Sequence, residues 1–338
     1  MTPEYVERFG YRKYEGKIEA RWKRIWNLAR FELINTWHKS TFGKVILIVL
    51  IIVNFFSITV DALIIAQVEK SEFIYWNQMI NASLRDFVAR YYALGLLFGM
   101  AVIRIDVPDE QFVPLGMTGI FFFLGFLLIG LISISGSGIF ADDRQGKVIE
   151  IYLSKLQTSE YVIGKILAIF LYINFFTTLP LFSLGVFYVQ ALGETHLDFL
   201  DYYVGILLSG ILNSLLLSLF ILIFSIMAEK RSFASLGFFL SYLMFTLFGG
   251  IIYQVQVNTQ DSPNEFLYLL SPSTFCALVT YSCFRTYELK IGHDTLLDLN
   301  DGSGLDFYHI FGLSFLLIML MTLFLLYRVK RMTTEELG

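Results

Sequence analysis

Six long apolar stretches constrain the fold of this chain more than any other feature. About 20 apolar residues can cross a bilayer as a helix, because some 30 Å of hydrocarbon is traversed at about 1.5 Å per residue. Strands of a barrel would alternate in polarity, and these stretches do not. An open sheet cannot satisfy its edge in lipid. We therefore expect an all-α integral membrane protein with six transmembrane helices, at residues 45–68, 115–140, 166–192, 203–228, 233–253 and 308–327.

The composition excludes several other classes of protein. Of the 338 residues, 56% are hydrophobic and 16% are charged, whereas soluble domains average about 45–50% and 25%. Two Cys and four His exclude a disulfide scaffold and leave little for a metal centre. The net charge of −4 gives no sign of nucleic-acid binding.

The charge distribution predicts the orientation in the cell membrane. With both termini cytoplasmic, 19 of the 25 Lys and Arg residues lie inside, as the positive-inside rule requires. The large outer loops are then residues 69–114 and 254–307, and the cytoplasmic tail is 331–338. A seventh span at 91–105 would invert every later loop, so this segment is expected to be re-entrant or interfacial.

Residues 1–43 form the cytoplasmic N-terminus and contain an amphipathic helix. Ile18, Trp22, Ile25, Ala29 and Leu33 follow helical spacing, and basic residues lie mostly off this stripe. We expect the helix to lie on membrane lipid in the inner headgroup plane. A soluble helix packed on a partner is the alternative, and the two are compatible.

Catalytic motifs are missing from the sequence. There is no Walker-type G-x-x-x-x-G-K-[ST], no H-E-x-x-H and no G-x-S-x-G. We expect no enzymatic activity, catalytic residue, cofactor or metal site on this chain.

The inside loop at 141–165 is the most informative segment. An acidic residue, Asp142 or Asp143, closes the second predicted span, and Gly146 precedes a short segment that contains Glu150 and ends in Leu153. Ser159-Glu160-Tyr161 and Gly164-Lys165 follow at the start of the third span. This run resembles the cytoplasmic loop of the type-2 ATP-binding-cassette (ABC) permease family, in which a Gly precedes a short coupling helix ending in Leu and a Ser/Arg-Glu-Tyr-x-x-Gly-Lys run opens span 3. The family often has Pro after the coupling helix, where this chain has Lys155-Leu156-Gln157.

The resemblance implies a permease domain at 44–330 that pairs with a copy or a relative. Separate ABC ATPase subunits would hold ATP and Mg²⁺ and drive transport, and we expect export. Tyr152 and Leu153 would contact the ATPase, with Glu150 and Arg144 fixing the register. The full set expected to couple to the ATPase is Asp142, Asp143, Arg144, Glu150, Tyr152, Leu153 and Glu160.

Polar residues within the spans are candidates for a cargo path. Asp61 lies in the first span, and an intramembrane carboxylate favours a functional role or a paired helix end. Ser133 and Ser135 face either a partner helix or the cargo path. Cys276 and Cys283 are expected outside, either free or paired across a helix break.

Two other functions stay open on the sequence. An ATP-independent carrier or channel is one, although no inverted repeat is found. A membrane scaffold that anchors a cytoplasmic complex is the other. The sequence does not indicate the cargo.

Overall fold

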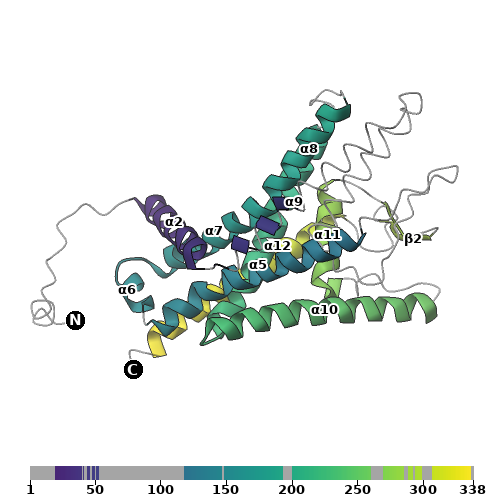
Figure 1. The fold of residues 1–338 in the computed structure, drawn as a ribbon. Helices are drawn as coiled ribbons and strands as arrows, with labels where there is room; N and C mark the ends of the chain where they lie inside the picture. Colours follow the sequence, from purple (N-terminus) through teal and green to yellow (C-terminus); the bar gives the residue numbers. More distant parts are fainter. Residues whose placement is uncertain are drawn as a thin grey trace, which may run out of the picture.

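The computed structural model consists mainly of long helices (Figure 1). It describes residues 20–39, 118–146, 148–192, 200–259, 269–284, 288–291, 294–298 and 307–335, and single positions at 41, 44–45, 48–49 and 51–52. The helices are α2 (Arg21–Lys39), α5 (Thr118–Gln145), α6 (Ile149–Leu153), α7 (Thr158–Phe176), α8 (Thr178–Leu192), α9 (Leu200–Met227), α10 (Arg231–Thr259), α11 (Pro272–Cys283) and α12 (Phe307–Glu335); the strands are β1 (Glu288–Ile291) and β2 (Asp294–Asp298).

Four of the described helical segments are long and apolar enough to cross a membrane: Thr158–Ser183, Tyr202–Met227, Arg231–Gly249 and Tyr308–Met332. They indicate a membrane-embedded protein, and they coincide with the last four predicted spans. Helix α5 contains residues 118–140 of the second predicted span. Most of the first predicted span, the whole outer loop 69–114 and the segment 91–105 lie outside the described residues.

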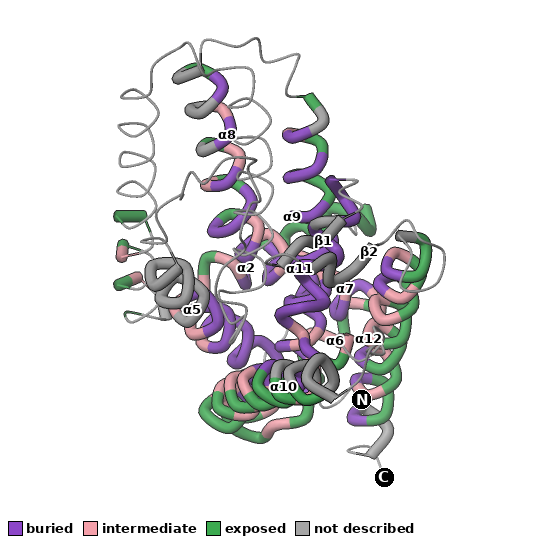
Figure 2. The backbone as a smooth tube through the Cα atoms, turned by 90° about the vertical axis from the view of Figure 1, so that its right-hand side faces the viewer, coloured by how far each residue is buried: buried purple, intermediate pink, exposed green. Residues whose placement is uncertain are grey.

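Helix α9 is the centre of the bundle. It packs against α5, α7, α8, α10, α11 and α12, and 67% of its apolar window is buried, whereas 17% of the window in α12 is buried. Figure 2 shows exposed residues along α10 and α12. The outer helices therefore present apolar surface, as expected where lipid or another membrane subunit surrounds a bundle.

The third predicted span is broken into α7 and α8. Helix α7 ends at Phe176, and Thr177 leaves the regular helix at φ −111° and ψ −64°. Pro180 follows one turn later and has no N–H to donate to the carbonyl of Phe176. The break therefore lies beside the proline.

A small antiparallel hairpin departs from the predicted all-α fold. Strand β1 pairs with β2, with Glu288 opposite Asp298 and a register shift between Leu289 and Lys290. This hairpin lies in the predicted outer loop 254–307. Hydropathy over a span-length window does not detect strands of four or five residues, so the prediction was incomplete here.

Different elements lie at the two ends of the helix bundle. Figure 1 shows α2, α6 and the C-terminal end of α12 toward one end, and the hairpin toward the other. Helix α6 and the hairpin therefore lie toward opposite ends of the bundle.

The two cysteines are free and buried. Both lie on α11, which continues unbroken from Pro272 to Cys283. Seven residues of helix separate their Cα atoms by about 10.5 Å, beyond the roughly 7 Å limit for a disulfide. Cys276 and Cys283 were expected to be either free or paired, and in the structure they are free thiols.

Burial predicts that these thiols react slowly. It raises the pKa of Cys276 to about 12 and that of Cys283 to about 12. Because the thiolate is the nucleophile, labelling by N-ethylmaleimide at pH 8 should be on the order of 10³-fold slower than for an exposed cysteine. Mass spectrometry should find both sites unlabelled in folded protein and labelled after denaturation in SDS. Rapid labelling of folded protein would contradict the buried position of α11.

Candidate functional site

The segment between α5 and α7 lies within the predicted inside loop 141–165. Helix α5 continues to Gln145, so Asp142, Asp143 and Arg144 form its last turn, and α7 begins at Thr158. The backbone N–H groups of Gly146 and Val148 bond to the carbonyls at the end of α5. Helices α5 and α7 therefore extend beyond the predicted spans into the loop 141–165. Hydropathy marks where a helix leaves lipid, whereas polar residues continue the helix beyond that point.

Helix α6 projects one apolar side chain from this connection. Ile151 is 61% exposed and Glu150 is exposed, while Ile149 is buried. Tyr152 and Leu153 are partly buried and pack against the core of the bundle. The outward surface of α6 is therefore formed by Glu150 and Ile151. Tyr152 and Leu153 lie on the opposite side of the helix and pack against the bundle.

Helix α2 packs along α7 and is tied to the start of that helix by charge. Glu160, which has no exposed surface, accepts a hydrogen bond from Arg24 Nη2 at 2.7 Å. Arg21 donates to Ser159 Oγ at 3.0 Å. Arg24 also reaches the carbonyl of Lys155 at 3.5 Å. Glu160, one of the residues expected to couple to the ATPase, is buried and pairs with Arg24 of α2.

Lys165 is fully buried at the junction of three helices. Its Nζ lies 2.6 Å from Glu32 Oε1 on α2 and 2.6 Å from Asp143 Oδ2 on α5, and it donates to the carbonyl of Ile139 at 3.0 Å. The hydroxyl of Tyr161 donates to Asp143 Oδ2 at 2.7 Å. Buried charges persist only when paired and hydrogen-bonded, and here each one is. We call Lys165, Glu32, Asp143 and Tyr161 the lysine cluster.

Helix α6 touches the lysine cluster through Tyr152. Its ring centroid lies 5.5 Å from Lys165 Nζ and 5.7 Å from the ring of Tyr161. Burial, and then the nearby carboxylates of Glu32 and Asp143, raise the pKa of Tyr152 to about 12. The phenol therefore stays neutral and presents its ring to the ammonium group, a favourable cation–π arrangement.

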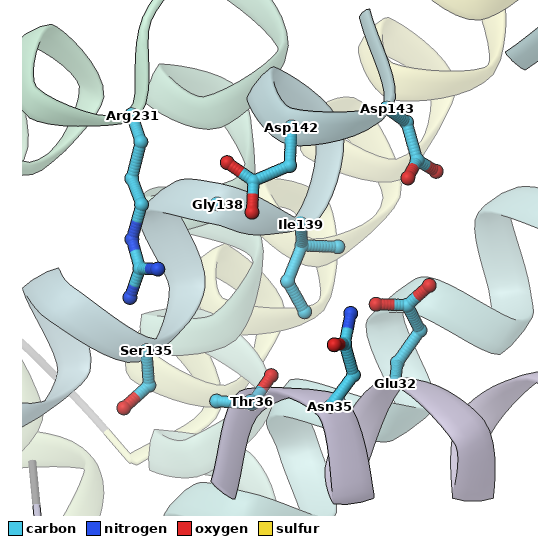
Figure 3. Close-up of a pocket in the computed structure, with 9 residues that line it drawn as sticks. All are labelled: Glu32, Asn35, Thr36, Ser135, Gly138, Ile139, Asp142, Asp143 and Arg231. Atoms are coloured by element: carbon cyan, nitrogen blue, oxygen red, sulfur yellow. The ribbon is translucent and has the colours of Figure 1, made fainter. Parts of the chain in front are cut away.

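A small polar cavity adjoins the cluster (Figure 3). Its volume is about 20 Å³, which is enough for one water molecule. Arg231, from the start of α10, lines it and donates to the carbonyl of Ile134 at 2.8 Å. Among the described residues, no three His, Cys, Asp or Glu side chains are grouped to hold a metal ion. The lining residues are Glu32, Asn35, Thr36, Ser135, Gly138, Ile139, Asp142, Asp143 and Arg231.

The predicted intramembrane residues have different surroundings. Ser133 hydrogen-bonds the carbonyl and hydroxyl oxygens of Ser235 on α10, both at 2.7 Å. Ser135 donates to the carbonyl of Leu131 in its own helix and lines the small cavity. Ser133 thus faces a partner helix. Asp61 lies outside the described residues.

The amphipathic stripe predicted for α2 is only partly right. Ile25 and Ala29 face α7 as part of a buried stripe, whereas Trp22 is 75% exposed. Glu32 follows Ile25 and Ala29 at helical spacing and is also buried. Its position on the same stripe is the sequence signal from which a buried carboxylate could have been predicted. Lys165 was noted as part of the Gly164-Lys165 pair at the end of the predicted inside loop, and nothing in its local sequence indicates a pairing with Glu32.

No protein-family model matches this chain, and no curated protein matches it.

Proposed function

We propose that this chain is the permease subunit of an ATP-driven transporter similar to the type-2 ABC permeases, and that it exports its cargo across the cell membrane. Separate ATPase subunits bind ATP and Mg²⁺, and a second permease subunit completes the pore. In this proposal both termini are cytoplasmic. The exposed apolar sides of α10 and α12 meet lipid and the second permease subunit.

The observation that carries the proposal is the outward surface of α6. Ile151 is 61% exposed on a helix of five residues, in a connection that lies beyond the apolar spans. A side chain of this size contributes roughly 1.5–3 kcal/mol when a partner buries it. Glu150 beside it supplies a charge that fixes the register of a partner, and Tyr152 and Leu153 anchor the helix to the bundle.

The test is a double variant of the outward surface, Glu150→Lys with Ile151→Asp. Losing one member of a desolvated charged pair costs about 2–5 kcal/mol, so the ATPase should no longer copurify from native membranes. Expression and insertion should be unaffected, because neither side chain packs in the bundle. The bound protein is identified by mass spectrometry, and ATP turnover of the purified complex is measured.

The matched control carries the same changes at the opposite end of the bundle. The control is Asp201→Lys with Leu200→Asp, which also reverses the charge of one acidic residue and makes one apolar residue acidic. Leu200 is 56% exposed. This variant should keep its ATPase. If wild-type protein brings down no ATP-hydrolysing partner, or the α6 variant retains it, the permease proposal is wrong and a carrier or scaffold is favoured.

The exposed face of α2 fits the proposed contact with lipid. Trp22 is 75% exposed and Trp26 is 53% exposed, and aromatic side chains favour the membrane interface. In vesicles containing brominated lipid, each of these tryptophans should be quenched when studied as the single remaining Trp. A variant with Ser at positions 22 and 26 should lose that part of the quenching. Equal fluorescence in brominated and plain vesicles would show that α2 does not lie on lipid.

A further inference from the structure

Helix α2 has two different faces. One face exposes Trp22 and Trp26, and the other is buried against α7. Surface helices of this kind need only an apolar face to lie on lipid. The buried face of α2 also carries Glu32, which is 4% exposed and ion-paired with the fully buried Lys165. Lipid contact does not explain this ion pair.

The lysine cluster links α2 to α6 by direct contacts. Glu32 belongs to α2, Asp143 to the end of α5, and Lys165 and Tyr161 to α7. Tyr152 of α6 lies against both Lys165 and Tyr161. A second link runs from Arg24 of α2 to Glu160, beside the N-terminus of α7. Three helices, α2, α5 and α7, thus share the ion pairs around Lys165, and α6 contacts them through the ring of Tyr152.

We infer that Lys165 is a positioning residue that makes α2 and α6 move as one unit, so that binding of the ATPase at α6 is transmitted to the membrane-surface helix. This inference rests on the proposed function. Separating α2 from α7 would break the buried ion pair between Glu32 and Lys165, so the network favours rigid movement of the two helices. A contact chain alone does not demonstrate coupling, and therefore the coupling itself must be measured.

The experiment uses hydrogen exchange on the complex with its copurified ATPase. Exchange is followed over residues 148–156 and 20–39, without nucleotide and with Mg-ATP and vanadate. In wild-type protein, Mg-ATP with vanadate should change the exchange rates of both segments. The Glu32→Gln variant removes the charge that joins α2 to Lys165 but leaves the Lys165–Asp143 pair. In this variant 148–156 should still respond, while the response of 20–39 should fall roughly tenfold, within the usual range of coupling between two sites.

A disulfide between α2 and α7 tests whether the Glu32→Gln variant fails because the two helices are no longer held together or because the fold is generally weakened. A Cβ atom at Gly164 would lie 3.2 Å from the Cβ of Leu28, close to the 3.5–4.5 Å of a disulfide. Leu28→Cys with Gly164→Cys should therefore bond α2 to α7. Added to Glu32→Gln, the oxidised tether should restore the response of 20–39, and reduction should abolish it again.

The control variant is Glu229→Gln, the same change at an exposed position between α9 and α10, which should behave as wild type. A normal response of 20–39 in the Glu32→Gln variant would overturn the inference while leaving the proposed function intact. A tether that restores nothing would also overturn it. If wild-type 148–156 does not respond to the ATPase, the proposed function fails first, and the inference falls with it.

Discussion

Replacing Lys165 with methionine should destabilise the folded chain by about 3–5 kcal/mol, the cost of removing one partner from a buried ion pair. Methionine fills similar space, so the loss comes from the carboxylates of Glu32 and Asp143, which both lie 2.6 Å from the ammonium group. Titration of the purified protein from mild detergent into SDS, followed by far-UV circular dichroism, gives the change in free energy of unfolding.

Two further variants separate charge from packing at Lys165. Lys155→Met removes an exposed lysine and should change the free energy of unfolding by less than about 1 kcal/mol. Adding Glu32→Gln and Asp143→Asn to Lys165→Met removes the unpaired charges, and should recover most of the lost stability because apolar or neutral replacements of a whole buried pair are tolerated. If Lys165→Met is as stable as Lys155→Met, the buried ion pair does not hold the bundle.

Gly136→Ala should destabilise the bundle by about 1–3 kcal/mol, the usual cost of overpacking. A Cβ atom at this position of α5 would lie 2.6 Å and 2.7 Å from two side-chain carbons of Ile221 on α9. Ile221 is fully buried, and its β-branched side chain has few alternative rotamers. The two helices would therefore have to separate, and SDS titration should report the loss.

The control is the same substitution at Gly312 of α12, where an added Cβ meets nothing within 4 Å. Gly312→Ala should be neutral or slightly stabilising, since alanine is the better helix former by up to about 1 kcal/mol. Equal stability of the two alanine variants would contradict the close contact between α5 and α9.

Membrane spans could be predicted from the sequence because hydropathy reports directly on lipid contact. Four of the six predicted stretches coincide with apolar helical segments long enough to cross a membrane. Helix ends could not be predicted in the same way, since Asp142 and Asp143 continue α5 beyond the apolar stretch. The hairpin was missed because its two strands are short and lie within a long loop between two predicted spans.

The candidate site was only partly predictable from the sequence, because tertiary packing and long-range pairing determine which side chains are exposed. The short helix α6 was expected from the resemblance of the loop to that of the type-2 ABC permeases, but its outward residue Ile151 is distinguished from Leu153 only by tertiary packing. Lys165 pairs with Glu32 at a separation of 133 positions in the chain. A single sequence carries no signal for an ion pair between such distant residues, although each lies on a helix that was predicted.

The most direct test of the account places a photoreactive residue at the outward surface of α6. Benzoyl-phenylalanine at position 151, irradiated in native membranes, should crosslink to a protein that contains a Walker motif, and Mg-ATP with vanadate should change the yield. The same residue at position 200, at the opposite end of the bundle, should not produce that adduct. Crosslinks from position 151 to lipid alone, or to the ATPase from position 200, would contradict the assignment of α6 as the docking surface for an ATPase.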